Sequence, residues 1–439
     1  KDGMRLICTN KFGVPVTAPS YDWSKADDLE LSVELPTRPR ASKLGKEIIA
    51  WKNPRSAFQV FLGSLNEMRG SEVNNTLAYV VQQAIKTDTE TDEALEFLTV
   101  LIDSRYDSGR YRRSRVVEKA NEALLRLLRS CRRVDENGHS LFSLADLKSK
   151  GKLVPPSSPY DRLVIDCEGF PMEGGDGVSF LIRRARELGW NRVILVGTHG
   201  QRFIGGGLGP RTKGFRIDVY GSPGDYLASG LDGAEIFVHS NGQDQLGQIF
   251  ADGKLVVHGD VGQTFLYGAK GGEAYILGNA AGRPLINAVG KPKVVINGTC
   301  LDYLAESFMA GNPLYGGGFV ILNGLGFDSK GNPVDLPTPY PGGNLFSLAS
   351  GGAIYVRDPK RTVGEDQLNG GRISKLSPSD WELILPHLKE NERLFGISVE
   401  RCLLKVDGVN KHPEDVYKKI EAMPRVTLEG TAQPQDTGS

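Results

Sequence analysis

The stretch Val294-Val295-Ile296-Asn297-Gly298 is one copy of a pattern that returns along the middle of the chain, a short apolar strand followed by a turn. One central apolar residue per copy serves as a marker, and Ile217, Ile236, Val256, Ile276 and Ile296 follow one another at steps of 19, 20, 20 and 20. Two longer steps, of 25 and 33, then lead to Ile321 and Ile354. A fixed step of about 20 residues indicates a solenoid of stacked repeats.

Two other β-containing folds fit this spacing poorly. A two-layer sandwich spaces its strands about 8–12 residues apart. A wound α/β fold places an amphipathic helix between strands, and the interval from His239 to Gly253 shows none. The chain also contains 54 glycines, which concentrate between Gly169 and Gly352. We therefore predict a mainly β chain built on a right-handed parallel β-helix over residues 160–362.

The rest of the chain is divided around this solenoid. Residues 1–42 are rich in proline and lack helical periodicity, which predicts an extended arm. Residues 43–150 show apolar side chains at helical spacing and are predicted to be a helical region. A solenoid end exposes strand edges that need a cap, so residues 363–425 are expected to be C-terminal capping helices. Residues 426–439 are polar and are predicted to be a flexible tail.

One helix of the helical region has a basic face. Its apolar face carries Val116, Ala120 and Leu124, and its other face carries Arg113, Lys119, Arg126, Arg129, Arg132 and Arg133. Such a face is either solvated or a docking surface for an acidic partner subunit.

Composition excludes several classes of partner. Lys+Arg and Asp+Glu are both 53, so the zero net charge gives no overall attraction to nucleic acid or to an anionic membrane. The printed sequence contains no apolar run near the roughly 18–20 residues of a membrane helix and no secretory signal pattern. The five cysteines are dispersed without a CxxC pair, which argues against a disulfide framework, an iron–sulfur cluster or a structural zinc held by this chain alone. We expect a cytoplasmic protein.

Three glycine-rich segments, 197–208, 267–275 and 350–356, resemble the glycine-repeat (GXGXG) β-helix domain at the C-terminal end of the glutamate synthase large subunit. The same domain occurs in one of the subunits of formylmethanofuran dehydrogenase, a tungsten or molybdenum enzyme. The resemblance covers about 160–425 and omits the helical region. It implies a non-catalytic scaffolding subunit of a glutamate-synthase-like or related oxidoreductase complex. The chain would bind no cofactor alone, and flavin, iron–sulfur clusters or tungsten or molybdenum would belong to its catalytic partner subunits.

A few residues are candidates for chemistry within the chain. His199 and Arg202 lie in the most family-like segment, and Cys167 follows a predicted strand end, so these three are the weak catalytic candidates. His239 and His258 end successive repeats, one repeat apart in the sequence, and stacking would bring them near each other. Two imidazoles without a third ligand make only a weak metal site.

Two further functions stay open. A stand-alone β-helix enzyme acting on carbohydrate would place carboxylates at matched positions of its coils, and the candidates are Asp225, Asp244, Asp260 and Asp302. A self-assembling scaffold, in which the chain forms a homo-oligomer, is the other alternative.

Overall fold

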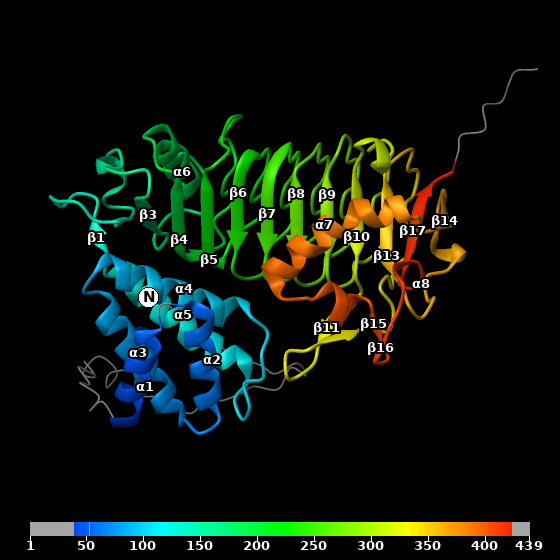
Figure 1. The fold of residues 1–439 in the computed structure, drawn as a ribbon. Coiled ribbons are helices and arrows are strands. Elements are labelled where there is room, and N and C mark those ends of the chain that lie inside the picture. Colours follow the sequence, from blue (N-terminus) through cyan, green and yellow to red (C-terminus); the bar gives the residue numbers. More distant parts are fainter. Residues whose placement is uncertain (1–38, 52, 424–439) are drawn as a thin grey trace, which may run out of the picture.

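A computed structural model describes residues 39–51 and 53–423. Within them, thirteen strands form one sheet, and Figure 1 shows these strands side by side with helices gathered along the sheet. Each strand from β1 to β10, and then β13, is parallel to the next. The fold is therefore α/β with a large, mostly parallel sheet. The prediction of a mainly β chain is wrong, because helices at both ends of the chain contribute much of the structure.

The parallel strands lie in chain order and keep a regular register. They are β1 (Arg132–Arg133), β2 (Phe142–Ala145), β3 (Arg162–Asp166), β4 (Arg192–His199), β5 (Arg216–Ser222), β6 (Asp232–Val238), β7 (Asp252–Val257), β8 (Glu273–Ile276), β9 (Lys293–Ile296), β10 (Phe319–Leu322) and β13 (Ala353–Arg357). The residues paired with Ile217 in successive strands are Ile236, Leu255, Ala274 and Val294. The steps between paired positions are therefore 19, 19, 19 and 20. The marker Val256 lies one position beyond this register, and the markers Ile276 and Ile296 lie two positions beyond it.

One face of the sheet packs against a second wall made of short turns. In one turn, Tyr226, Ala228 and Gly230 have φ angles of 62°, 62° and 65°, which is unusual for the first two residues. Between them Leu227 points into the core and is fully buried. The Ala228 amide donates to Ile204 O in the previous turn at 2.8 Å, and the Tyr226 amide donates to Asp244 O in the next at 3.1 Å. Hydrogen bonds thus join successive turns as well as successive strands.

Helices cover the other face of the sheet in two separate groups (Figure 1). The N-terminal cover consists of α1 (Pro39–Ala50), α2 (Pro54–Leu65), α3 (Gly70–Ala84), α4 (Asp88–Asp103) and α5 (Arg113–Arg129). It packs on side chains of β3 to β5 such as Val164, Ile194 and Tyr220. The C-terminal cover is α7 (Pro378–Phe395), which packs on side chains of later strands such as Val256 and Tyr275.

The end of the sheet is closed by strands. The chain after β13 forms β14 (Gly371–Lys375) and β17 (Tyr417–Ala422), and β17 pairs antiparallel with both β13 and β14. Residues 363–425 were expected to form helices that cap the end of a solenoid, but α7 lies across the face of the sheet. Its apolar residues Ile384 and Leu388 are fully buried there.

A hairpin leaves the sheet between β10 and β13. Its strands are β11 (Leu325–Phe327) and β12 (Pro333–Asp335), and its turn reaches the N-terminal cover. Gly331 in this turn has φ +80°, and a Cβ there would meet the backbone nitrogen of Tyr106. Only glycine permits so close an approach in that backbone conformation.

The remaining elements are short. They are α6 (Val178–Glu187), α8 (Pro413–Val416), β15 (Lys405–Val406), β16 (Val409–Asn410), a π-helix (Val399–Leu403) and the 3₁₀ turns Lys150–Lys152, Pro313–Tyr315 and Glu365–Gln367. The predicted arm lies outside the described residues up to residue 38, and α1 begins at Pro39. The predicted tail, 426–439, lies wholly outside them. Among the described helices, none is long and apolar enough to cross a membrane.

Candidate functional site

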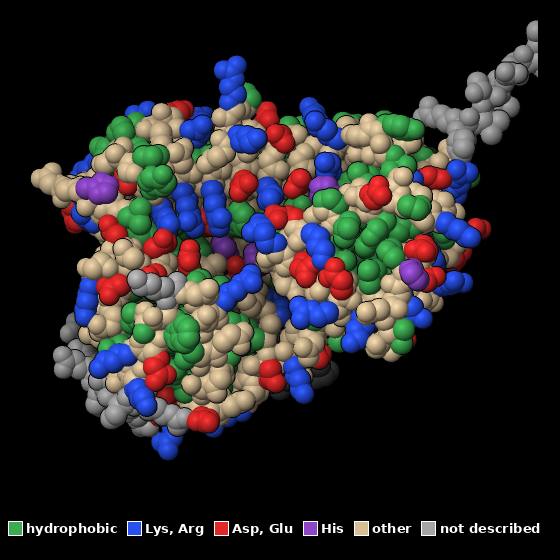
Figure 2. All heavy atoms as spheres, viewed as in Figure 1, with side chains coloured by type: hydrophobic (Ala, Val, Ile, Leu, Met, Phe, Trp, Pro, Cys, Tyr) green, Lys and Arg blue, Asp and Glu red, His purple; other side chains and the backbone are tan. Residues whose placement is uncertain are grey.

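A cleft of about 360 Å³ lies where the two helical covers meet above the sheet. Its walls come from five parts of the chain: α2, the C-terminal end of α4, the C-terminal end of α7, the hairpin β11–β12 and the loop after β7. Asp103, Arg105, His258, Phe327 and Phe395 are among its lining residues. Figure 2 shows histidine side chains deep in the hollow between the helices and the sheet.

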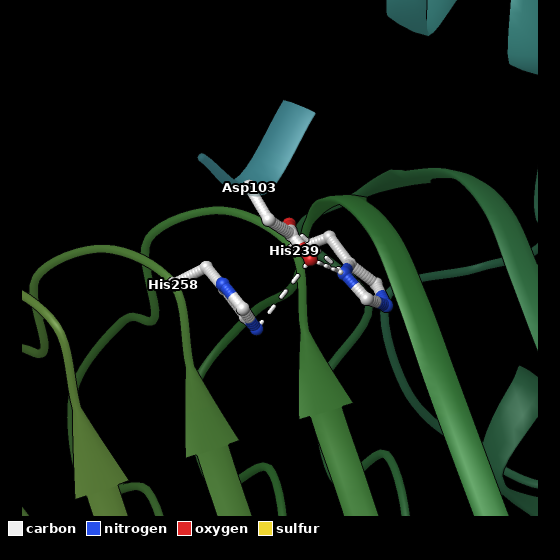
Figure 3. Close-up of side chains that lie close together, drawn as sticks. All are labelled: Asp103, His239 and His258. Atoms are coloured by element: carbon white, nitrogen blue, oxygen red, sulfur yellow. Dashed lines mark hydrogen bonds and ion pairs between the residues drawn. The ribbon is translucent and has the colours of Figure 1, made fainter. Parts of the chain in front are cut away.

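Three side chains from distant parts of the sequence converge at the base of this cleft (Figure 3). Asp103 Oδ2 lies 2.9 Å from His239 Nδ1 and 3.5 Å from His258 Nε2. One ligand atom from each of the three residues lies within 4.8 Å of the other two. Both imidazoles are buried, and Asp103 is partly buried.

The parallel strands position both histidines. His239 directly follows β6, and His258 directly follows β7. Their backbone amides continue the ladder by donating to Val219 O at 3.0 Å and Val238 O at 2.9 Å. Their rings therefore stack at the ends of adjacent strands, with centroids 5.5 Å apart, and Tyr220 stacks on the far side of His239 at 4.1 Å. The carboxyl ends of parallel strands are where α/β sheets place their ligand sites.

Asp103 reaches the histidines because it is the last residue of α4. The C-terminal turn of that helix is held by Arg113, which donates to Ile102 O and, at 2.8 Å, to Ser104 O. Just beyond the helix end, Arg105 donates to the backbone carbonyl of His258 at 3.1 Å. Arg113 thus holds the backbone on both sides of Asp103, and Arg105 joins the helix end to the loop after β7.

A second carboxylate, Asp218 on β5, completes the charge network. It is fully buried, and it pairs with Arg192 at 3.0 Å and Arg216 at 2.6 Å. Its Oδ1 also lies 3.5 Å from His239 Nε2. Burial alone would raise the pKa of Asp218, but the hydrogen bond from His239 and the two guanidinium groups hold it far below its usual range.

The pKa values of the two stacked imidazoles are shifted in opposite directions. Burial opposes protonation of His239, yet its two carboxylate neighbours, Asp103 and Asp218, outweigh burial and raise its pKa to about 9. Burial lowers the pKa of His258 to about 4, because Asp103 compensates only in part. The two carboxylates thus favour the protonated form of His239, whereas burial favours the neutral form of His258.

The sequence-predicted site residues fall in different places. The predicted proximity of His239 and His258 is what the structure shows, but their carboxylate partner Asp103 was not foreseen. His199 is exposed at the end of β4. Arg202 lines a separate small cleft, where it pairs with Glu173 at 2.6 Å and Asp225 at 3.6 Å. No contact in the described structure joins either residue to the cluster.

Cys167 lies in an environment that suits a structural thiol. It is fully buried, its Sγ lies 3.7 Å from Ile165 O, and burial raises its pKa far above the ordinary thiol value. A nucleophilic cysteine needs the thiolate form, which this environment disfavours.

The carboxylates proposed for a carbohydrate enzyme bind backbone amides of a later turn instead. Asp225 and Asp244 each accept the backbone amide of the residue 19 positions later, at 3.3 and 2.7 Å. Asp260 accepts the Asn279 amide at 2.7 Å, and Asp302 accepts the Gly343 amide at 2.7 Å. Each carboxylate thereby joins its own turn to a later one.

Comparison with known families identifies the sheet region. Residues 189–404 match the GXGXG motif family. This part of the chain is a GXGXG domain. The match agrees with the predicted glutamate-synthase-like relationship, and a search of curated proteins found no match. His239 and His258 belong to the GXGXG domain, whereas Asp103 comes from the N-terminal cover outside it. The cluster therefore exists only where that cover docks on the domain.

Proposed function

We propose that this chain is a scaffolding subunit of a glutamate-synthase-like or related oxidoreductase complex. In this proposal the GXGXG domain is a right-handed parallel β-helix whose rigid shape holds catalytic partner subunits. The observation that carries the proposal is the even register of its strands, with hydrogen bonds joining successive coils on both walls. Flavin, iron–sulfur clusters, or tungsten or molybdenum would belong to the partners, and the assembly would be cytoplasmic.

The wall of turns opposite the helical covers is the proposed partner surface. Three large apolar side chains of this wall are exposed. Ile249 and Tyr267 lie in neighbouring turns, and Leu348 lies in a later one. Exposed large apolar side chains on one wall favour protein contact. The basic face of α5 is a weaker candidate, because Arg129 pairs with Asp166 and Glu168 and Arg113 binds backbone carbonyls.

The alternatives receive less support from the structure. The carboxylates that a carbohydrate enzyme would use are engaged in hydrogen bonds with backbone amides, which weakens that hypothesis. A self-assembling scaffold would use the same exposed wall, so the test must separate a homo-oligomer from a hetero-complex.

The proposal is tested by purifying the tagged full chain from its native host under mild conditions. Native mass spectrometry then reports the masses that accompany it, and absorption spectroscopy reports flavin or iron–sulfur cofactors. We expect stoichiometric partner subunits that carry a redox cofactor. Ile249→Glu and Leu348→Glu should release these partners. Val409→Glu, an exposed apolar site in β16, is the matched control and should retain them. A chain that purifies only as a monomer or only with copies of itself would refute the proposal.

A further inference from the structure

We propose that Asp103, His239 and His258 bind a divalent transition metal ion of the zinc or ferrous iron class. This site is independent of the scaffolding role, because it lies at the cleft between the helical covers and not on the wall of turns. Its ligands come from three elements, α4 and the segments directly after β6 and β7.

The geometry brings the ligand atoms to the separations that such an ion requires. Zinc binds imidazole nitrogen and carboxylate oxygen at about 2.0–2.2 Å, so neighbouring ligand atoms around it lie roughly 3–3.5 Å apart. Asp103 Oδ2 is 2.9 Å from His239 Nδ1 and 3.5 Å from His258 Nε2. All three atoms lie within 4.8 Å of one another, so a small rotation of the imidazoles would complete the site.

The donor set narrows the class of ion. Two imidazoles and one carboxylate suit zinc and ferrous iron, whereas calcium and magnesium prefer oxygen ligands alone. Three protein ligands leave at least one coordination position open, as in catalytic rather than structural metal sites. Asp103 and His258 also line the cleft, so the open position would face space that a small molecule can enter.

The surroundings of the three residues resemble those of metal ligands. His239 turns its other ring nitrogen toward Asp218 Oδ1, at 3.5 Å, and Arg192 and Arg216 hold that carboxylate in place. Metal-bound histidines commonly direct the second nitrogen at a carboxylate, which fixes the ring. Arg105 fixes His258 through its backbone carbonyl. The C-terminal ends of α4 and α7 line the cleft, and the partial negative charge of a helix C-terminus favours a cation.

Metal binding is measured on the full chain produced without a histidine tag, stripped with a chelator and titrated with Co²⁺. Cobalt gives visible absorption bands whose intensity reports its coordination, and Zn²⁺ is then added as a competitor. We expect one Co²⁺ per chain, displaced by one Zn²⁺. Asp103→Asn and His258→Gln should abolish stoichiometric binding. Asp218→Asn should keep the cobalt spectrum but weaken affinity about 10–100-fold, since it alters only the support of His239.

Two kinds of control distinguish a variant that lacks a metal ligand from one that has failed to fold. His199→Gln and His412→Gln replace exposed histidines elsewhere, and both variants should bind Co²⁺ as the parent chain does. Circular dichroism and thermal unfolding of the stripped variants check that each has folded. If the folded parent chain binds no stoichiometric Co²⁺, the proposal is wrong. It is equally wrong if folded Asp103→Asn and His258→Gln bind Co²⁺ as tightly as the parent.

Discussion

Replacing Asn391 by alanine tests how firmly α7 is attached to the sheet. Asn391 and Asn297 are both fully buried and exchange two side-chain hydrogen bonds, at 2.8 and 2.9 Å. Asn297 also donates to Ile276 O at 2.9 Å and accepts from Asn323 at 2.9 Å. Alanine removes both bonds to Asn391 and leaves one hydrogen of the buried Asn297 amide without its acceptor.

The magnitude follows from this count. Two lost hydrogen bonds cost about 1 kcal/mol each, and one buried amide hydrogen left unpaired adds about 1 kcal/mol. Asn391→Ala should therefore lower the free energy of unfolding by about 2–4 kcal/mol. Urea denaturation followed by circular dichroism measures the loss, and the fluorescence of Trp381, which lies on the same helix, reports release of α7.

Two further variants make this test specific. Lys389→Ala on the same helix removes an exposed lysine whose ion pairs are with Glu392 and Glu400, and it should change stability by less than about 0.5 kcal/mol. A double-mutant cycle with Asn297→Ala should give a coupling energy of about 1–2 kcal/mol. The reasoning fails if Asn391→Ala costs no more than Lys389→Ala, or if the cycle shows no coupling.

Three other predictions concern single positions. Thr264 has φ 54°, so Thr264→Gly should raise the free energy of unfolding by about 1 kcal/mol in urea denaturation, whereas Thr264→Ala, which keeps the Cβ, should give less than half of that. The hydrogen bond from Arg393 is the largest of the interactions that lower the pKa of Glu390 from 4.5 to about 2. The ionised Glu390 therefore stabilises the fold above pH 4.5, and this stabilisation is lost as the pH falls toward 2. Glu390→Gln should flatten the dependence of the free energy of unfolding on pH in this range. Iodoacetamide should label half-buried Cys402 in the native protein but not buried Cys167, and mass spectrometry showing the reverse would contradict the burial argument.

The strands could be predicted from the sequence, but their register could not be fixed. The apolar runs around Ile217, Ile236 and Ile296 each form the predicted strand. In Leu255-Val256-Val257, all three residues are buried, because helices cover the outer face of the sheet as the turns cover the inner face. A strand that is apolar throughout does not reveal which residues face which side. The markers therefore depart from the observed register, by one position at Val256 and by two at Ile276 and Ile296.

The sequence predicted the two histidines of the site but not its carboxylate. The spacing of one repeat between His239 and His258 indicates that they stack, because equivalent positions of successive coils are neighbours. Asp103 is the last residue of an ordinary amphipathic helix, and its role depends on where that helix docks. Docking joins Asp103 to His239 across more than a hundred positions of sequence, and local sequence pattern carries no signal of it. The strand β17 was missed likewise, since its pairing partner β13 lies far earlier in the chain.

The segments that connect β9 to β10 and β10 to β13 are longer than those between β5 and β9, yet β10 pairs in register with both strands, with Phe319 opposite Lys293 and Ala353. Residues added at a corner of the stack thus leave the strand pairing unchanged. One such addition carries the hairpin whose turn at Gly331 abuts Tyr106 and forms a wall of the cleft. Corner length can therefore vary between related proteins without altering the stack, so the size and lining of the cleft can diverge while the framework beneath it stays constant.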